Sequence, residues 1–343
     1  MKCSIVHIAS FLLAAVLLAG CKTDTPELSA PDDFPMEIQF QVSNATPSEA
    51  TRATIVNDNS DLQSQDITVY GYFHGSSPYR DCFYSDMRYS SSMWKFIDGG
   101  GNQVHFYWPI EGSVHTTSST TVTSLDFFGL CPATPPSHIS FTLNPTGPII
   151  YCSSLPVTSA GQTALEEFLY AFTPGKTYTD QVAAGGAIPL EFHHPFAKIS
   201  LQLKTSHRAI YNLNTIKFKN IKNNGTFTHD KNPQWVASGD NTDLTITVND
   251  GISADADFTS AQVTSMSLPL IVLPQSLTTA DQIEVKLTWN NGDSETTYTF
   301  DNLVGEWQSG KSYTYTLDLL GEIKFSVIID DWSSEETSRN IRF

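Results

Sequence analysis

The chain has 343 residues, of which 40% are hydrophobic and only 16% are charged. Its 19 lysines and arginines stand against 36 aspartates and glutamates, which gives a formal net charge of −17 at pH 7. Such a negative chain repels nucleic acid and anionic membrane surfaces, so neither is expected to bind through charge. At ~100–200 residues per domain, the length behind an export signal fits about two domains.

The first residues have the pattern of a bacterial lipoprotein signal. Residues 5–18 are mostly apolar, too short to span a bilayer, and follow the basic residue Lys2. They end in Leu-Ala-Gly-Cys at 18–21, which predicts removal of residues 1–20 and lipidation of Cys21. Several acyl chains on one residue would anchor the chain stably. The alternative is an ordinary secretory signal followed by a chance cysteine. Residues 21–35 are polar and predict a tether.

Two segments at opposite ends of the chain resemble each other. Residues 36–42 alternate strictly and predict a half-buried strand, whose apolar face carries Ile38, Phe40 and Val42. Residues 322–329 show the same alternation, with Ile323, Phe325, Val327 and Ile329 on one face. Glu37-Ile38-x-Phe40-x-Val42 and Glu322-Ile323-x-Phe325-x-Val327 agree at four of six positions.

Strand patterns fill most of the first half of the chain. Alternating or aromatic-rich segments bounded by turn residues predict strands at 66–73, 93–97, 103–109, 125–132 and 138–145. Residues 163–172 differ, because Leu165, Phe168, Leu169 and Phe172 have helical spacing. We expect one short helix there. The Gly-Gly-rich stretch at 183–189 indicates a boundary between an N-terminal domain, residues 36–185, and a C-terminal domain, residues 186–343.

The second half continues with short alternating segments up to residue 329. Asn-Gly pairs at 224–225 and 291–292 lie between such segments and predict hairpins, because a type I′ turn needs positive φ at both central residues. Many short strands with turn signals favour an all-β protein built of β-sandwiches. Helical solenoids and α/β sheets do not fit this pattern.

The candidate chemical motifs do not predict a catalytic, cofactor or metal site. Residues 305–312 satisfy the Walker A pattern, but an alternating segment follows where phosphate binding needs a helix, so a turn entering a strand is expected, with Trp307 against the core. His193 and His194 are adjacent and would point to opposite faces of a strand. Oxygen-rich runs at 57–61 and 255–257 lack the closing glutamate of a calcium loop, although a loop calcium site stays open.

The cysteines allow two interpretations. Cys82, Cys131 and Cys152 remain after processing, so at most one internal disulfide forms. Either a disulfide forms, with Cys131–Cys152 slightly favoured over the other pairs, or all three residues stay as buried thiols.

A surface glycan-binding lipoprotein of a nutrient-uptake system is the alternative function. Its ligand face would need exposed aromatic side chains, for which the candidates are Trp94, Trp108, Trp235, Trp289 and Trp307. A lipid-anchored hydrolase lacks support, since no nucleophile motif is present.

The first arginine of the chain, Arg52, stands in a small, polar segment. Residues 43–54 are mostly small and polar, which is typical of an exposed loop that a protease can draw into its cleft. Cleavage after Arg52 would release the strand at 36–42 together with the lipid anchor. The alternative is an ordinary solvated arginine.

The chain resembles the fimbrillin-like lipoproteins, the type V pilins of Gram-negative anaerobes. The resemblance covers most of the chain and rests on the lipobox, "TRAT" at 51–54, "VYGYF" at 69–73, "FYWP" at 106–109, "LDFFGLCP" at 125–132, "FHHPFAKISLQL" at 192–203 and "WQSGKSYTYTL" at 307–317. It implies two transthyretin-like β-sandwich domains and a precursor lipidated at Cys21. It also implies cutting between Arg52 and Ala53 by an arginine-specific protease, followed by polymerisation through strand exchange.

The resemblance also implies where the protein acts and with which partners. The precursor would be an outer-membrane lipoprotein exported to the cell surface, and the processed chain would join other pilin subunits in a fimbrium that mediates cell adhesion. Because the two end segments share a side-chain pattern, we expect residues 36–42 to fill a groove that residues 322–329 of another subunit later occupy.

Overall fold

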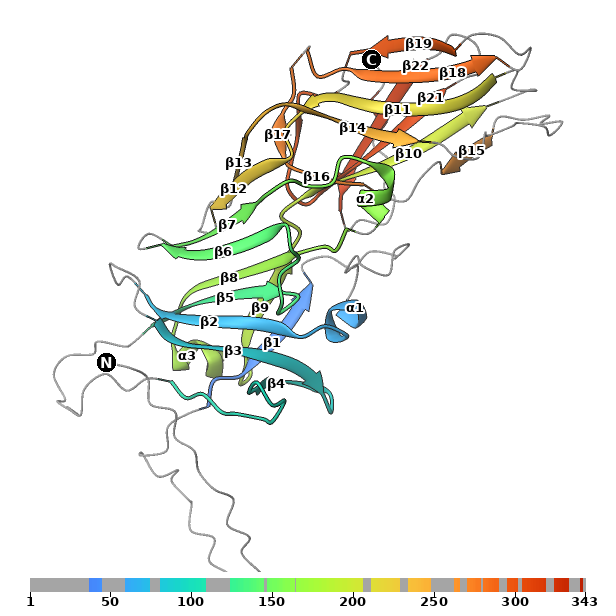
Figure 1. The fold of residues 1–343 in the computed structure, drawn as a ribbon. Coiled ribbons are helices and arrows are strands. Elements are labelled where there is room, and N and C mark those ends of the chain that lie inside the picture. The colour runs from blue at the N-terminus through green and yellow to red at the C-terminus, as the bar shows by residue number, and fades with distance from the viewer. Residues whose placement is uncertain are drawn as a thin grey trace, which may run out of the picture.

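The computed structural model describes most of the chain after residue 36. The described residues are 37–44, 59–74, 81–108, 124–144, 147–163, 165–205, 211–228, 234–247, 262–265, 270–278, 280–289, 295–301, 304–318, 324–332 and 340–341. They are mostly strands, with a few short helices (Figure 1). The all-β prediction is confirmed.

The N-terminal half forms a seven-stranded sheet from the described strands. In spatial order these are β1 (Phe40–Asn44), β9 (Ile188–His193), β8 (Leu169–Lys176), β5 (Leu125–Cys131), β2 (Ile67–Phe73), β3 (Asp81–Ser90) and β4 (Met93–Ile97). Neighbouring strands run antiparallel except β1 and β9, which are parallel. The first strand of the chain therefore lies at an edge, beside a strand from the middle of the sequence.

The central strand of this sheet is buried on both faces. Every residue of β5 is buried, because one face packs on the N-terminal core and the other on a second core beneath a neighbouring sheet. Phe127 faces the first core and Leu130 the second. A strand covered on both sides reads as a continuous apolar run rather than an alternation.

The C-terminal half packs two sheets face to face. One contains β15 (Gln262–Ser265), β10 (Ala197–Thr205), β21 (Lys311–Asp318), β22 (Lys324–Asp331) and β23 (Asn340–Ile341), with β16 (Leu270–Val272) also paired to β10. The other contains β14 (Thr242–Thr247), β11 (Tyr211–Ile221), β18 (Ile283–Trp289) and β19 (Glu295–Phe300). Their inner faces form one large apolar core.

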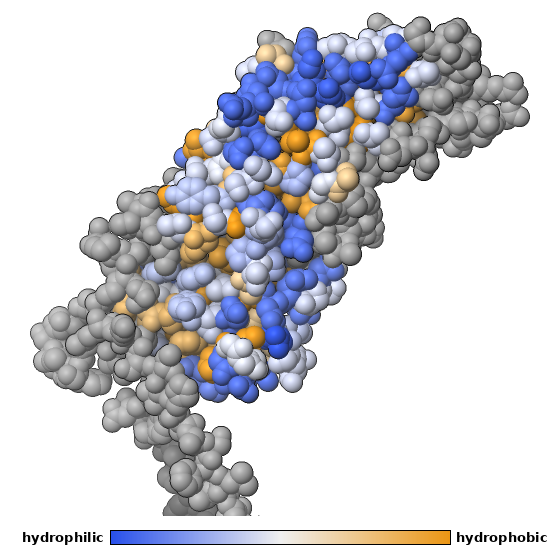
Figure 2. All heavy atoms as spheres, in the orientation of Figure 1, coloured by the Kyte–Doolittle hydropathy of each residue, from blue (hydrophilic) through white to orange (hydrophobic). Residues whose placement is uncertain are grey.

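The outer face of the β11–β18 sheet is charged. Lys217 lies 3.8 Å and Lys219 3.6 Å from Glu284, and Lys286 lies 2.9 Å from Glu295. Figure 2 shows hydrophilic residues gathered in the upper part of the view, where Figure 1 places β11 and β18. Antiparallel sheets with one solvated face show this division.

A third sheet joins the two halves of the chain. Its strands, in spatial order, are β13 (Gln234–Ser238), β12 (Asn224–Thr228), β7 (Gly147–Cys152) and β6 (Ile139–Asn144). β7 precedes and β12 follows the expected boundary near residue 186, and they pair through Gly225 opposite Cys152. A small apolar core lies under this sheet and includes Phe168, Phe227 and Trp332. The division into two domains stays a prediction.

The described helices lie elsewhere than expected. They are α1 (Asn59–Gln63), α2 (Ser159–Thr163) and α3 (Tyr178–Ala183). The helix predicted at 163–172 is wrong over its described C-terminal part, because residues 165–168 are not helical and Leu169 begins β8. Phe168 and Leu169 are both buried, since this strand lies between two cores. Apolar runs of this kind cannot be assigned to helix or strand by periodicity alone.

The hairpin predicted at Asn224-Gly225 is also wrong. Both residues lie inside β12, which pairs with β7 and β13 and not with the preceding β11. Asn291-Gly292 lie outside the described residues, although β18 and β19 on either side of them pair antiparallel. β17 (Gln275–Ser276) and β20 (Glu306–Trp307) form a further two-stranded ladder.

Candidate functional site

The strand that contains Ile38, Phe40 and Val42 completes the first core. Ile38, Phe40 and Val42 have exposed fractions of 1%, 5% and 9%, while Gln41 between them is exposed. The Phe40 ring meets Phe127 edge to face at 4.9 Å and Phe96 at 5.9 Å between centroids. Each of the three buried side chains stabilises the fold by roughly 1.5–3 kcal/mol. Without this strand, the core would be open to water.

The main chain of the same segment is held along both edges. On one side, β1 pairs in parallel with β9, with Phe40 opposite Ile188 and Val42 opposite Leu190. On the other side, the Ile38 N–H donates to the Phe106 carbonyl at 2.8 Å. We call residues 37–44 the leader and the surface that receives them the leader slot. It is formed by residues 188–192, residues 105–108 and Gln181.

Gln181 of α3 contacts the leader through main-chain atoms. Its Nε2 donates to the Glu37 carbonyl at 2.8 Å, and its Oε1 accepts the Gln39 N–H at 3.2 Å. The same Oε1 accepts the indole N–H of Trp108 at 2.9 Å. Gln181 is only 5% exposed, so these bonds form away from bulk water.

A capping box positions α3 and hence Gln181. The Thr177 hydroxyl accepts the Asp180 N–H, and the Asp180 carboxylate accepts the Thr177 N–H at 2.7 Å. The pKa of the Asp180 carboxyl is lowered, first by its hydrogen bond with the Thr177 side chain and then by the Thr177 N–H. A Ser/Thr-x-x-Asp/Glu pattern before a helix is readable in the sequence, but the contacts of the following glutamine are not.

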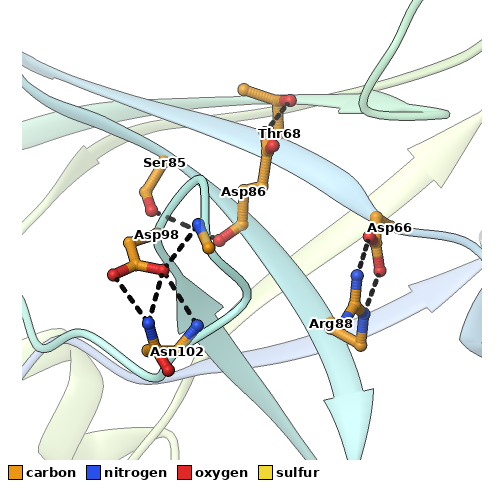
Figure 3. A network of polar contacts seen from close by, with 8 residues as sticks. Asp66, Thr68, Ser85, Asp86, Arg88, Asp98 and Asn102 are labelled. Carbon is orange, nitrogen blue, oxygen red and sulfur yellow. Dashed lines mark hydrogen bonds and ion pairs between the residues drawn. The ribbon is translucent and has the colours of Figure 1, made fainter.

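A polar network lies on the strands that lead to the other edge of the slot (Figure 3). Arg88 binds both carboxylate oxygens of Asp66, at 2.8 and 2.6 Å. Asp98 accepts the N–H groups of Gly100 and Asn102 at 2.9 Å and closes the turn after β4. That turn directs residues 103–107 back toward the leader, where Tyr107 forms a bridge with Glu37.

β9 depends on the leader for much of its ladder. β8 pairs with β9 at only two positions, Tyr170 opposite His193 and Ala171 opposite Phe192. The leader pairs with five residues of β9, from Ile188 to Phe192. Loss of the leader would therefore leave most of one edge of β9 without a pairing partner. Such an exposed edge is prone to aggregation and can pair with another strand.

The C-terminal segment that resembles the leader lies in the other sandwich. β22 pairs with β21 along its whole length, and Phe325 and Val327 are buried in the C-terminal core, with Ile329 partly buried against it. On its second side, β23 pairs with it only at Val327 and Ile328. Ile323 lies outside the described residues. The slot and β22 thus sit in separate cores of the same chain.

Several sequence-predicted residues cannot be placed. Cys21, Arg52 and Ala53 lie outside the described residues. The structure therefore describes the leader strand and most of the similar C-terminal strand, but not the expected lipidation and cleavage positions. Sequence reasoning did not identify Gln181 and Trp108 as parts of the slot.

The Walker A-like segment and three of the candidate tryptophans have structural rather than binding surroundings. Gly305 precedes β20, Trp307 is buried, and Lys311 begins a strand, as expected for a turn entering β21. Trp94 and Trp108 are buried as well, which removes three of the five tryptophans considered for a glycan-binding face.

Within the described ranges, no group of three or more His, Cys, Asp or Glu side chains could hold a metal ion. Cys82, Cys131 and Cys152 form no disulfide and are buried, and burial raises the pKa of Cys152 to about 12. In the part of the chain that the structure describes, no helix is both long and apolar enough to cross a bilayer.

Fold and site together define a class of protein: an all-β protein whose first core is closed by a strand that comes early in the chain. The sequence matches the family described as fimbrillin-like over residues 51–332. The chain belongs to the fimbrillin-like family. The matched range begins after the leader strand. The comparison with curated proteins gave no match.

Solved structures share the fold at low sequence identity. A fimbrial protein from Bacteroides vulgatus aligns with a TM-score of 0.54 at 12% identity, covering 86% of this chain and 99% of that chain. A proposed cell adhesion protein from Bacteroides ovatus aligns with a TM-score of 0.53 at 16% identity, covering 88% and 99%. Another from Bacteroides uniformis gives 0.51 at 14% identity, covering 88% and 99%.

Proposed function

We propose that the chain is a structural subunit of a fimbrium that serves cell adhesion, made as a lipidated precursor and assembled by strand exchange. Cys21 would carry the lipid that holds the precursor at the outer membrane. An arginine-specific protease would cut between Arg52 and Ala53. The processed subunit would then bind other pilin subunits.

One observation carries this proposal. The leader strand completes the N-terminal core with Ile38, Phe40 and Val42, and it precedes Arg52 in the sequence. Cleavage there would leave the strand bound by non-covalent contacts alone. The tethered leader has a large effective concentration in the slot, and cutting removes that advantage over a competing strand.

The replacement would come from β22 of another copy. Its alternation buries Phe325 and Val327 on one face, as the leader buries Phe40 and Val42. Main-chain hydrogen bonds would supply affinity and the alternating pockets would supply specificity, which is the logic of β-augmentation. β22 lies next to the edge of its sheet, where only the short β23 covers it, so its removal breaks few ladders besides that with β21.

The test is limited digestion of the purified mature chain with an arginine-specific protease, followed by electrophoresis without boiling. We expect cleavage after Arg52, mapped by mass spectrometry, and a ladder of multimers that resists SDS. A monomer that persists after complete cleavage at Arg52 would overturn the proposal.

Two variants separate processing from nonspecific cutting. Arg52→Ala should remain monomeric under the same digestion. Arg208→Ala, which removes an arginine elsewhere in the chain, should still give the ladder. Multimers from Arg52→Ala would show that release of the leader is not the step that starts assembly.

A further inference from the structure

The Gln181 side chain stands where a peptide group of a neighbouring strand would otherwise be. Ile188 donates its N–H to the Gln39 carbonyl at 2.8 Å, and that bond is the first of the β9 ladder. One step earlier along the leader, the Gln39 N–H and the Glu37 carbonyl have no strand opposite them. The amide of Gln181 supplies the acceptor and the donor that they need.

The chain before β9 explains why a side chain is needed there. α3 ends at Ala183, and Gly185 and Gly186 follow with φ of +82° and +104°. The Gly186 N–H donates to the Gln181 carbonyl at 2.8 Å, so the chain makes a turn after α3 before it enters β9 at Ile188. The amide thus extends the parallel ladder beyond the point where β9 itself begins.

The orientation of this amide is determined by its neighbours. An indole N–H can only donate, so the atom that faces Trp108 Nε1 must be the amide oxygen. Nε2 is then the atom at the Glu37 carbonyl, where only a donor fits. The site is therefore polarised: it offers a fixed acceptor and a fixed donor to whatever main chain lies in the slot.

None of these contacts involves a leader side chain. Gln181 binds the N–H of Gln39 and the carbonyl of Glu37, groups that every non-proline residue carries. After loss of the leader, Trp108 still donates to Oε1, whereas Nε2 loses its main-chain acceptor. Any β-strand that enters the slot in the same register would restore that bond.

We propose that Gln181 is a positioning residue that binds the main chain of the strand entering from a second copy of this protein. This inference rests on the proposed function. The incoming Glu322-Ile323-x-Phe325-x-Val327 then takes the place of Glu37-Ile38-x-Phe40-x-Val42. In this complex Nε2 donates to the Glu322 carbonyl and Oε1 accepts the Lys324 N–H, both from the second copy. The residue recognises either strand without reading its sequence.

The chain contains a matched control for this chemistry. Gln162 is also buried, and its amide binds the main chain of Ile271: Nε2 donates to the Ile271 carbonyl at 3.0 Å, and Oε1 accepts the Ile271 N–H at 2.8 Å. Its partner strand, β16, stays in place in every step proposed above. Gln162→Leu should therefore weaken the fold without changing the affinity for an incoming strand.

The test uses the full mature chain, cut at Arg52 and stripped of its leader, with a fluorescent peptide of residues 320–332 as the probe. Peptide affinity is measured by anisotropy for the wild type, Gln181→Leu, Gln181→Glu and Gln162→Leu. Gln181→Glu keeps the acceptor for Trp108, loses the donor and adds a negative charge, so it is a second variant whose polar side chain fits the site if the leucine variant misfolds. A second peptide carries an N-methyl group on the Lys324 nitrogen.

We expect Gln181→Leu and Gln181→Glu to bind the peptide about tenfold more weakly, since each net hydrogen bond is worth roughly a two- to twelve-fold change. Gln162→Leu should bind like the wild type. N-methylation of Lys324 should weaken binding to the wild type and have little further effect on Gln181→Leu. A methyl effect of equal size in both proteins, or unchanged affinity in the Gln181 variants, would overturn the assignment. If the unmodified peptide does not bind the stripped wild type, the strand-exchange proposal itself fails.

Discussion

The rings of His194 and Trp332 stack with their centroids 4.4 Å apart and their planes 6° from parallel. His194 directly follows β9, the strand that pairs with the leader, and Trp332 directly follows β22. Lys198 Nζ lies 5.4 Å from the Trp332 ring centroid and donates to the Trp332 carbonyl at 3.3 Å. The end of the proposed donor strand is thus anchored in the core between the two halves, beside the strand that lines the slot.

A buried hydrogen-bond contact supports this stack. His194 Nδ1 contacts the Glu167 carboxylate, and both side chains are almost completely buried. Burial lowers the pKa of Lys198, and the nearby Glu167 acts in the opposite direction. Trp332 Nε1 has no hydrogen-bond partner among the described residues, so its contribution comes from packing.

Trp332→Ala should destabilise the protein and loosen β22. Truncation of a buried tryptophan to alanine costs about 3–5 kcal/mol, while Trp332→Phe should cost less because it keeps a ring on His194 and loses no hydrogen bond. Urea unfolding measures the loss, and hydrogen exchange should show faster exchange in residues 324–331. Trp307→Ala removes a tryptophan from the C-terminal core and is the matched control. Equal exchange of β22 in both variants would contradict an anchoring role.

Phe40→Ala should weaken the binding of the leader in its slot. The change removes the edge contacts with Phe96 and Phe127 and leaves a void, at a cost of about 3–5 kcal/mol. In chains cut after Arg52, the leader fragment should therefore dissociate faster, as followed by size-exclusion chromatography over time. Gln41→Ala changes an exposed side chain on the same strand and should release the fragment at the wild-type rate. Equal rates for both variants would refute the contribution of Phe40.

Thr177→Ala should lower stability in a pH-dependent way. Loss of the N-cap costs about 1 kcal/mol. The folded pKa of Asp180 is lowered by Thr177, so the carboxylate's contribution is complete above the unfolded pKa of about 4 and disappears as the pH falls through the lower folded value. Thermal unfolding of both proteins should show a constant difference near neutral pH that shrinks in acid. A difference that grows as the pH falls would have the wrong sign.

Gly225→Ala should destabilise the sheet that joins the two halves. A Cβ at this position would lie 2.8 Å from Leu273 Cδ2 and 3.0 Å from the Val236 carbonyl oxygen, so backbone or core atoms must shift. Overpacking of this kind costs about 1–3 kcal/mol. Gly99→Ala is the control, because a Cβ there meets no atom within 4 Å. The check is the difference between their urea midpoints, and equal midpoints would show that the strands can separate at no cost.

Local side-chain pattern determined much of the secondary structure. The alternation in residues 38–42 and 324–329 reflects strands with one buried face, and the alternation after Gly310 is that of β21. Such patterns are visible in a sequence because period-two burial depends only on neighbouring residues. The same reasoning failed at residues 165–172, where burial on both faces erased the alternation, and at Gly225, whose missing side chain serves close packing rather than a turn.

By itself, the sequence determined that the chain is built of strands and which faces of its end strands are apolar. Only the tertiary structure decided that the leader pairs in parallel with β9, that Gln181 completes its ladder, and that one sheet joins strands from both halves. Parallel pairing joins residues about 150 positions apart in a ladder whose hydrogen bonds involve backbone groups common to all non-proline residues. Side-chain pattern therefore selects the buried face of a strand, while the partner is selected by the packing of the whole core.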